Sequence, residues 1–103
     1  MASDDKAFMA EVIADYLAKE PENFALLMEA HQNGSFANMK YYAHKLRSAV
    51  QIIGAAVFQE RLEQIEHFAG MADNQVNNCF GELPALQQEV ILELNQELNI
   101  LRS

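Results

Sequence analysis

The apolar residues of this chain recur three or four positions apart along most of its length, which is the period of one face of an α-helix. Between residues 36 and 53 the apolar positions are Phe36, Met39, Ala43, Leu46, Val50 and Ile53. Ser35 is a favourable N-cap for such a helix, and Gly54 can end it in the left-handed conformation. The pattern predicts a helix over 36–53 with one face buried.

The first segment, 4–32, has the same periodicity on both sides of Pro21. Its apolar face contains Met9, Ile13, Leu17, Phe24, Leu27 or Met28, and His31. A proline inside a helix removes one backbone hydrogen bond and crowds the preceding turn. Since the pattern keeps its phase across the proline, we predict one helix kinked at Pro21 rather than two separate helices.

Two more helices are predicted in the second half of the chain. The helix over 55–71 has an apolar face formed by Phe58, Leu62, Ile65 and Ala69. The helix over 74–102 has one formed by Leu83, Leu86, Val90, Leu94, Leu98 and Leu101. Gly81 and Pro84 are expected to weaken the first third of this last helix. Four amphipathic helices joined by short turns predict an all-α fold, an antiparallel up-down four-helix bundle, in a single domain over 1–103.

The composition sets limits on the core and on the compartment. The chain has 103 residues, half of them apolar and none of them Trp, so the core must consist of aliphatic side chains, Phe and Met. Cys79 is the only cysteine and cannot form an internal disulfide, which fits a reducing compartment. No apolar run is long enough to span a bilayer, and the polar, acidic start is unlike a signal peptide. We therefore expect a cytoplasmic chain, or the cytosolic part of a larger protein.

The charge is unevenly distributed. A formal net charge of −8 argues against binding to nucleic acid and against an anionic membrane, because both favour clustered Lys and Arg. Residues 30–59, however, contain no Asp or Glu, and Lys40, Lys45 and Arg47 all lie among them. A local positive patch can select an acidic partner surface or a phosphoryl group. The alternative is chance clustering on a solvated helix face.

Among residues 30–59, His44 has the side chain most able to take part in a reaction. At about 100° per residue it lies opposite the apolar face of the helix over 36–53, so its imidazole is expected to be exposed. Its neighbours on the helix surface are Lys40, Tyr41, Arg47, Ser48 and Gln51. The cations disfavour a protonated ring, and the neutral ring is the nucleophilic form. Once the ring carries a phosphoryl group, the same cations can neutralise the added charge.

The remaining candidate groups favour structural roles. His31 falls near the end of the first helix, where it can cover the core or interact with the helix dipole. Glu63 and His67 are one turn apart and could supply two metal ligands, but bundle metal sites need more ligands from facing helices, so no metal site is expected. Cys79 is expected to be a buried or half-buried small side chain. With no nucleophile elbow or phosphate-cradling glycine loop, the chain alone is not expected to be an enzyme.

The run Ala43-His44-Lys45-Leu46-Arg47-Ser48-Ala49, followed by Gly54-Ala55, resembles the signature of histidine-containing phosphotransfer (HPt) domains. The resemblance extends over nearly the whole chain, including the stretch from Tyr16 to Pro21 and the turn 33–36. Two positions depart from the family pattern. Arg47 stands where the family has Lys, and it keeps the charge and can bind phosphate oxygens in a bidentate way. Ser48 stands where the family has Gly, so it could hydrogen-bond the ring or narrow the set of partners.

The resemblance implies a phosphocarrier of a multistep two-component relay, with His44 as the phosphoacceptor. It further implies that a receiver domain, from a response regulator or a hybrid sensor kinase, supplies the phosphoaspartate and Mg²⁺, while this chain has no cofactor of its own. In that scheme the phosphoryl group is supported by Lys40, Arg47, Ser48 and Gln51, and the partner docks on Tyr41, Lys45 and Ile52.

Some alternatives remain open at this stage. Gln51 can equally be a polar surface residue, and Tyr41 and Ile52 can equally pack against the first helix. A non-phosphorylated helical adaptor that binds a receiver or a kinase through its surface is the alternative function. We expect a monomer, either free-standing or the cytosolic C-terminal domain of a membrane-bound sensor kinase.

Overall fold

A computed structural model describes residues 2–103, with side chains from Asp5 onward. It contains the helices α1 (Ala2–Gln32), α2 (Phe36–Ile53), α3 (Ala56–Phe68) and α4 (Asp73–Arg102), and no strand occurs in the described range. The prediction of an all-α four-helix bundle is confirmed.

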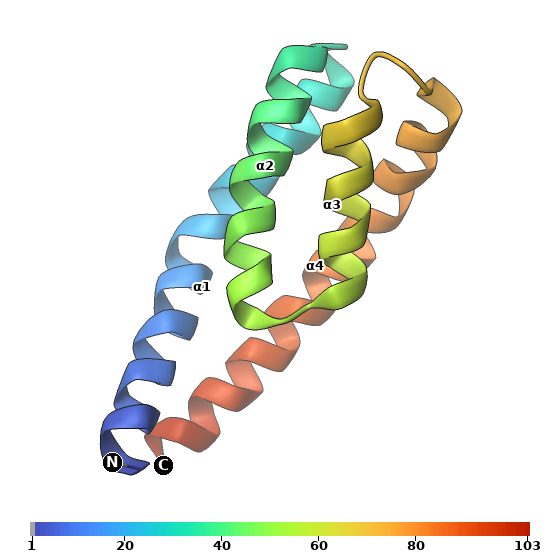
Figure 1. Cartoon of the computed structure of the whole chain (residues 1–103). Helices are drawn as coiled ribbons and strands as arrows, with labels where there is room; N and C mark the ends of the chain where they lie inside the picture. The colour runs from blue at the N-terminus through green and yellow to red at the C-terminus, as the bar shows by residue number, and fades with distance from the viewer. Residues whose placement is uncertain (1) are drawn as a thin grey trace.

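The four helices pack in a closed cycle. α2 contacts α1 and α3, and α4 contacts α3 and α1. The chain reverses direction at each connection, so α1 begins and α4 ends at the same end of the molecule (Figure 1). α1 and α4 are much longer than α2 and α3, and they extend past the turn between α2 and α3 (Figure 1). The molecule is therefore elongated, with extents of 47 × 20 × 20 Å.

The core follows the predicted apolar faces closely in α2 and α3. The predicted positions that are buried or partly buried in these helices are Met39, Ala43, Leu46, Val50, Ile53, Phe58, Leu62, Ile65 and Ala69. Phe36 is the exception, with 48% of its surface exposed. Its ring lies over the turn before α4, where a Cβ placed on Gly70 would be 3.2 Å from the ring. Phe36 therefore covers one end of the bundle instead of entering the core.

Two differences concern the outer helices. Met9 was predicted in the core but is 46% exposed, and it lines an open groove with Ile53 of α2 and Leu94 of α4. Tyr16 was not predicted there, yet it is buried, and its hydroxyl donates a hydrogen bond to Gln87 Oε1 on α4 over 3.3 Å. Gln87 is itself buried, and its Nε2 has no partner among the described residues.

The helix ends agree with the predicted boundaries to within about three residues. α1 is one helix that continues through Pro21, as predicted, and it begins two residues before the predicted start. Gly54 ends α2 with φ +77°, and its N–H donates to Val50 O over 3.0 Å. Ser35 occupies the N-cap of α2 as predicted, but its hydroxyl makes no capping bond.

α3 and α4 differ more from prediction. α3 ends at Phe68 instead of residue 71, because Ala69 is extended and Gly70 has φ +83°. α4 continues through Gly81 and Pro84, and its first third carries buried Val76, Cys79 and Phe80. The expected weakness of that third is therefore not seen, since these side chains anchor it to the core.

Candidate functional site

His44 lies on the outer surface of α2, with 59% of its side chain exposed. It is placed there by the burial of the opposite face, because Ala43 and Leu46 are fully buried. A single helix cannot turn both faces to the core, so burying this apolar face directs the imidazole outward. The predicted exposure of His44 agrees with this position.

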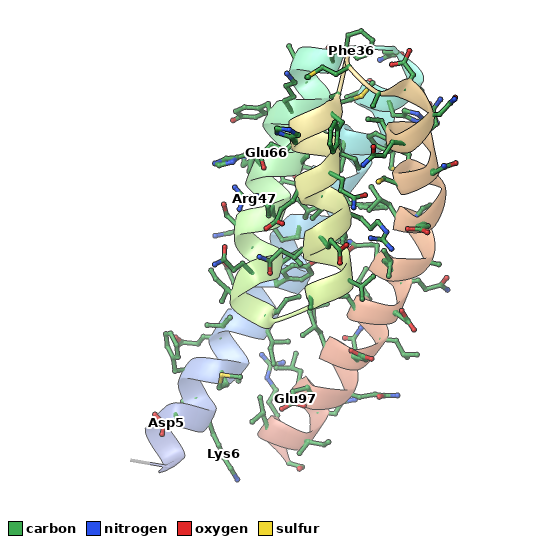
Figure 2. The ribbon with its side chains drawn as sticks, turned by 45° about the vertical axis from the view of Figure 1, so that its right-hand side comes forward. Asp5, Lys6, Phe36, Arg47, Glu66 and Glu97 are labelled. Carbon is green, nitrogen blue, oxygen red and sulfur yellow. The ribbon has the colours of Figure 1, made fainter. Side chains whose placement is uncertain are left out.

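A carboxylate from α3 binds His44 and Arg47 together. Glu66 Oε1 lies 2.6 Å from His44 Nδ1, and Glu66 Oε2 accepts a hydrogen bond from Arg47 Nε over 2.8 Å. Figure 2 shows Arg47 and Glu66 meeting between α2 and α3. Glu63 adds a longer contact, with its Oε1 4.0 Å from Arg47 Nη1. We call His44, Arg47 and Glu66 the histidine cluster.

This geometry determines which ring nitrogen of His44 carries the proton. An ionised carboxylate only accepts hydrogen bonds, so Nδ1 must donate to Glu66 at 2.6 Å. Arg47 Nη2 lies 3.2 Å from the same nitrogen, but Nδ1 cannot accept from it while it donates to Glu66. In the neutral ring the lone pair is therefore on Nε2. Nε2 forms no hydrogen bond with any described residue, and the His44 side chain as a whole is 59% exposed.

The electrostatics around His44 differ from the sequence prediction. The prediction placed the imidazole between two cations, Lys40 and Arg47. The structure brings Arg47 to the ring but not Lys40, and it adds the carboxylate of Glu66, which lies against the ring and pairs with Arg47. Burial by itself would raise the pKa of Glu66, but hydrogen bonds from Arg47 and His44 outweigh burial and hold its pKa below the usual value. Glu66 is thus a carboxylate at neutral pH and contributes a negative charge to the site.

Sequence reasoning missed Glu66 because its role depends on a contact across helices. It lies 22 residues after His44, and the sequence indicates only that it is away from the apolar face of α3. The packing of α3 against α2 decides that this carboxylate, and not that of Glu60, reaches the imidazole.

The predicted phosphoryl-supporting residues are distributed around the same surface. Lys40 and Gln51 are exposed on α2, and the structure brings neither into the histidine cluster. Ser48 is also exposed, but its hydroxyl donates to the backbone carbonyl of His44 over 3.2 Å rather than to the ring. Of the four, only Arg47 has a side-chain atom within hydrogen-bond distance of the His44 ring.

The predicted docking residues are exposed. Tyr41 is 58% exposed and Ile52 is 72% exposed, so neither is packed into the contact with α1. Lys45 Nζ lies 5.9 Å from the centre of the Tyr41 ring, within range of a cation–π contact. Tyr41 and Lys45 lie near His44 on α2, while Ile52 is two turns further along the helix.

The other candidate groups are held in structural contacts. His31 Nε2 lies 2.8 Å from Asn77 Oδ1, and its ring stacks on Phe80 with centroids 4.0 Å apart. Cys79 is buried, and burial raises the pKa of its thiol, which donates to Gln64 Oε1. His67 is exposed beside Phe68. Among the described residues no three His, Cys, Asp or Glu side chains cluster as a metal site would require.

Comparison of the chain with known proteins adds no relative. No family model, no curated protein and no solved structure matches it. Within residues 2–103, none of the helices combines the length and the apolar character needed to cross a membrane.

Proposed function

We propose that this protein is a phosphocarrier of a two-component relay that accepts a phosphoryl group on Nε2 of His44 and passes it to another receiver domain. The observation that carries the proposal is the histidine cluster: an exposed imidazole whose Nδ1 is hydrogen-bonded to Glu66 and whose Nε2 has no hydrogen-bond partner among the described residues. The motif around His44 and the helical bundle support the same assignment.

Glu66 and Arg47 have distinct roles in the proposed reaction. Glu66 holds the ring in the tautomer with the proton on Nδ1, so that the Nε2 lone pair points at an incoming phosphoryl group. Arg47 holds the carboxylate of Glu66 in place through its Nε. A nucleophile that is already oriented needs no reorganisation at the moment of reaction.

The transfer balances without any further reactant. The lone pair of Nε2 forms a bond to phosphorus as the bond between phosphorus and the aspartyl oxygen of the receiver breaks. The receiver keeps a carboxylate, and the ring becomes a phosphorylated imidazolium with its proton still on Nδ1. Glu66 lies 2.6 Å from that nitrogen and stabilises the positive charge that develops on the ring.

The receiver partner supplies the rest of the chemistry in this proposal. Its Mg²⁺ and charged groups stabilise the transferring phosphoryl group. Lys40 and Lys45 are exposed on α2 near His44 and give the acidic receiver pocket a complementary surface. Tyr41 and Ile52 add apolar contact area, and Ser48 and Gln51 lie within the surface that the partner would cover.

Incubating the protein with a radiolabelled phosphorylated receiver tests the proposal. We expect label on the chain that survives base and is lost in acid, as for a phosphoramidate, and that disappears in His44→Gln. His31→Gln and His67→Gln are matched controls, because each removes another imidazole, and both should keep the label.

Two outcomes would contradict the proposal. If His44→Gln were labelled as strongly as the wild type, the acceptor would be another residue. If no receiver of the source genome transferred label, although one of them bound, the adaptor alternative would replace the phosphocarrier.

A further inference from the structure

The end of the bundle away from the turn between α1 and α2 has an open apolar groove. α1 and α4 continue past the turn between α2 and α3, so no third or fourth helix covers their inner faces there (Figure 1). The apolar groove residues are Phe8, Met9 and Val12 of α1, Ile52 and Ile53 of α2, and Leu94 of α4. We call this surface the end groove.

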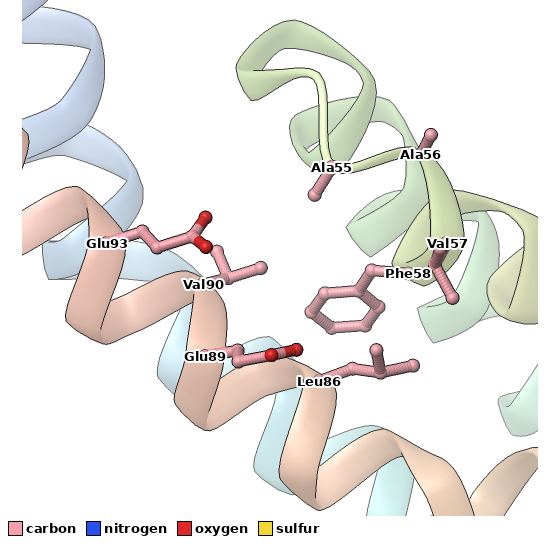
Figure 3. Close-up of a pocket in the computed structure, with 8 residues that line it drawn as sticks. All are labelled: Ala55, Ala56, Val57, Phe58, Leu86, Glu89, Val90 and Glu93. Atoms are coloured by element: carbon pink, nitrogen blue, oxygen red, sulfur yellow. The ribbon is translucent and has the colours of Figure 1, made fainter.

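The apolar surface of the end groove is unusually exposed. Phe8 is 65% exposed and Ile52 is 72% exposed, although both are large apolar side chains. A second groove lies beneath the turn between α2 and α3, where Leu86 and Val90 of α4 lie opposite the buried Phe58 (Figure 3). Exposed apolar side chains gathered around one groove of a small protein are typical of an interaction site.

A row of carboxylates borders the apolar surface. Glu89, Glu93 and Glu97 are spaced four residues apart on α4, so they lie on one side of that helix, and all three line the grooves at this end. Figure 3 shows Glu89 and Glu93 on either side of Val90. Neither Glu93 nor Glu97 has a Lys or Arg within ion-pair distance among the described residues. The groove thus combines an apolar floor with an unneutralised acidic border.

We propose that the end groove binds a basic amphipathic helix of a partner protein. The apolar face of such a helix would cover Phe8, Ile52 and Leu94, and its Lys or Arg side chains would reach Glu93 and Glu97. Charge complementarity selects this occupant over two others. A second copy of the chain would bring another net charge of −8, and an anionic membrane would meet the carboxylates directly.

The end groove is separate from the histidine cluster. Ile53 follows His44 by nine positions, which is about 13 Å along the helix axis. Glu97 lies at the end of the molecule where Asp5 and Lys6 are found, far from Arg47 and Glu66 (Figure 2). The partner helix can therefore bind whether or not His44 is phosphorylated, although a receiver docked on Ile52 would compete with it. The proposal rests on the groove itself and stands independently of the proposed function.

A designed peptide provides the probe. It is an 18-residue fluorescent helix with Leu on one face and Lys on the other, and fluorescence anisotropy measures its binding to the full chain. We expect it to bind at least tenfold more tightly than a scrambled peptide of the same composition, and more tightly than the equivalent Leu/Glu helix. Affinity should fall as salt is raised.

Pairs of variants distinguish binding in the groove from non-specific electrostatic attraction to the net negative charge of the chain. Glu93→Lys with Glu97→Lys should weaken binding at least tenfold. Glu22→Lys with Glu29→Lys makes the same change in net charge at exposed sites on α1, and it should weaken binding less than threefold. Ile52→Ser should also weaken binding severalfold, whereas Leu92→Ser, at a site 59% exposed and outside the groove, should not. Circular dichroism checks that each variant is folded.

Several results would overturn the proposal. They are equal binding of the scrambled peptide, equal loss of affinity in the two Glu-to-Lys pairs, and no binding at all. If sedimentation showed self-association that Ile52→Ser abolishes, the occupant of the groove would be a second copy of the chain and not a partner helix. Binding to phosphatidylglycerol vesicles with the same dependence on Ile52 would likewise replace the helix with a membrane.

Discussion

The carboxylate of Glu66 links the two residues of α2 that the sequence marks as chemically important. It lies 2.6 Å from His44 Nδ1 and 2.8 Å from Arg47 Nε, and its side chain is 28% exposed. An isolated exposed ion pair contributes about 0–1 kcal/mol. A carboxylate that accepts from two partners is more firmly held, so Glu66 both orients the imidazole and joins α3 to α2.

Glu66→Gln should therefore reduce stability in a pH-dependent way. We expect the free energy of unfolding at neutral pH to fall by about 1 kcal/mol. Because the folded pKa of Glu66 lies below its usual value, its stabilisation is present above the pKa of an unfolded glutamate and is lost as the pH falls through the folded pKa. Urea unfolding of both proteins between about pH 3 and 7 measures the difference, which should shrink toward acid.

The matched control for this prediction is Glu63→Gln. Glu63 is 51% exposed and 4.0 Å from Arg47, so this variant should stay within about 0.5 kcal/mol of wild type. Equal losses in the two variants, or a difference that does not change with pH, would contradict the role assigned to Glu66.

At the scale of the helices, the spacing of apolar residues correctly predicted the buried side chains of those helices that are covered by neighbours along their whole length. The apolar faces of α2 and α3 are correct except for Phe36. The errors lie where the environment depends on distant parts of the chain. Met9 is exposed in the open groove where α1 meets the end of α2, and Tyr16 is buried against α4 with its hydroxyl donating a hydrogen bond to Gln87. The orientation of His44 was predictable from its own helix, whereas its contact with Glu66 was not.

Replacement by Ala is predicted to change stability in opposite directions at two glycines. Gly81 lies on the exposed surface inside α4 with open space around it, so Gly81→Ala should stabilise the protein by about 0.5–1 kcal/mol. Gly54 also has open space, but its φ of +77° strains any residue with a Cβ, so Gly54→Ala should destabilise by about 1 kcal/mol. Thermal unfolding should move the melting temperature in opposite directions. A shift of the same sign in both would contradict the helical position of Gly81 or the left-handed position of Gly54.

Substitutions of the buried pair Tyr16 on α1 and Gln87 on α4 should have non-additive effects on the free energy of unfolding. Burial, reinforced by the nearby charge of Glu20, raises the pKa of the Tyr16 phenol well above its usual value, so the hydroxyl stays protonated and donates to Gln87. Tyr16→Phe or Gln87→Met alone leaves a buried polar group unpaired and should cost about 1–3 kcal/mol. The double variant removes both polar groups and should cost less than the sum. Strict additivity in denaturant unfolding would contradict the coupling.

For the whole molecule, the important property is the separation of its two surfaces. The histidine cluster lies between α2 and α3, while the end groove lies where α1 and α4 extend beyond them (Figure 2). The charges divide similarly, with Lys40 and Lys45 on the surface of α2 near His44 and the row of Glu side chains on α4. In the two proposals made above, an acidic partner binds at the first surface and a basic helix at the second.

Charge reversal on α2 tests the first of these attractions. Lys40→Glu should slow phosphotransfer from a receiver by about tenfold at low salt, since electrostatic steering acts on the encounter rate. The effect should shrink as salt screens it. Lys6→Glu makes the same charge change at the far end of α1 and should leave the rate nearly unaltered. Equal slowing by both variants would mean that only net charge matters, and no slowing by Lys40→Glu would mean that the patch plays no part in docking.

The most direct test of the central claim is to identify the phosphorylated nitrogen. Protein labelled with ¹⁵N in its histidines is phosphorylated by a receiver and followed by NMR, which distinguishes Nδ1 from Nε2 in each ring. We predict that the proton of His44 is on Nδ1 before transfer, that the phosphoryl group arrives on Nε2, and that Glu66→Ala loses the tautomer preference and slows transfer at least tenfold. A phosphoryl group on Nδ1 of His44, on His31 or His67, or on no histidine would contradict the account.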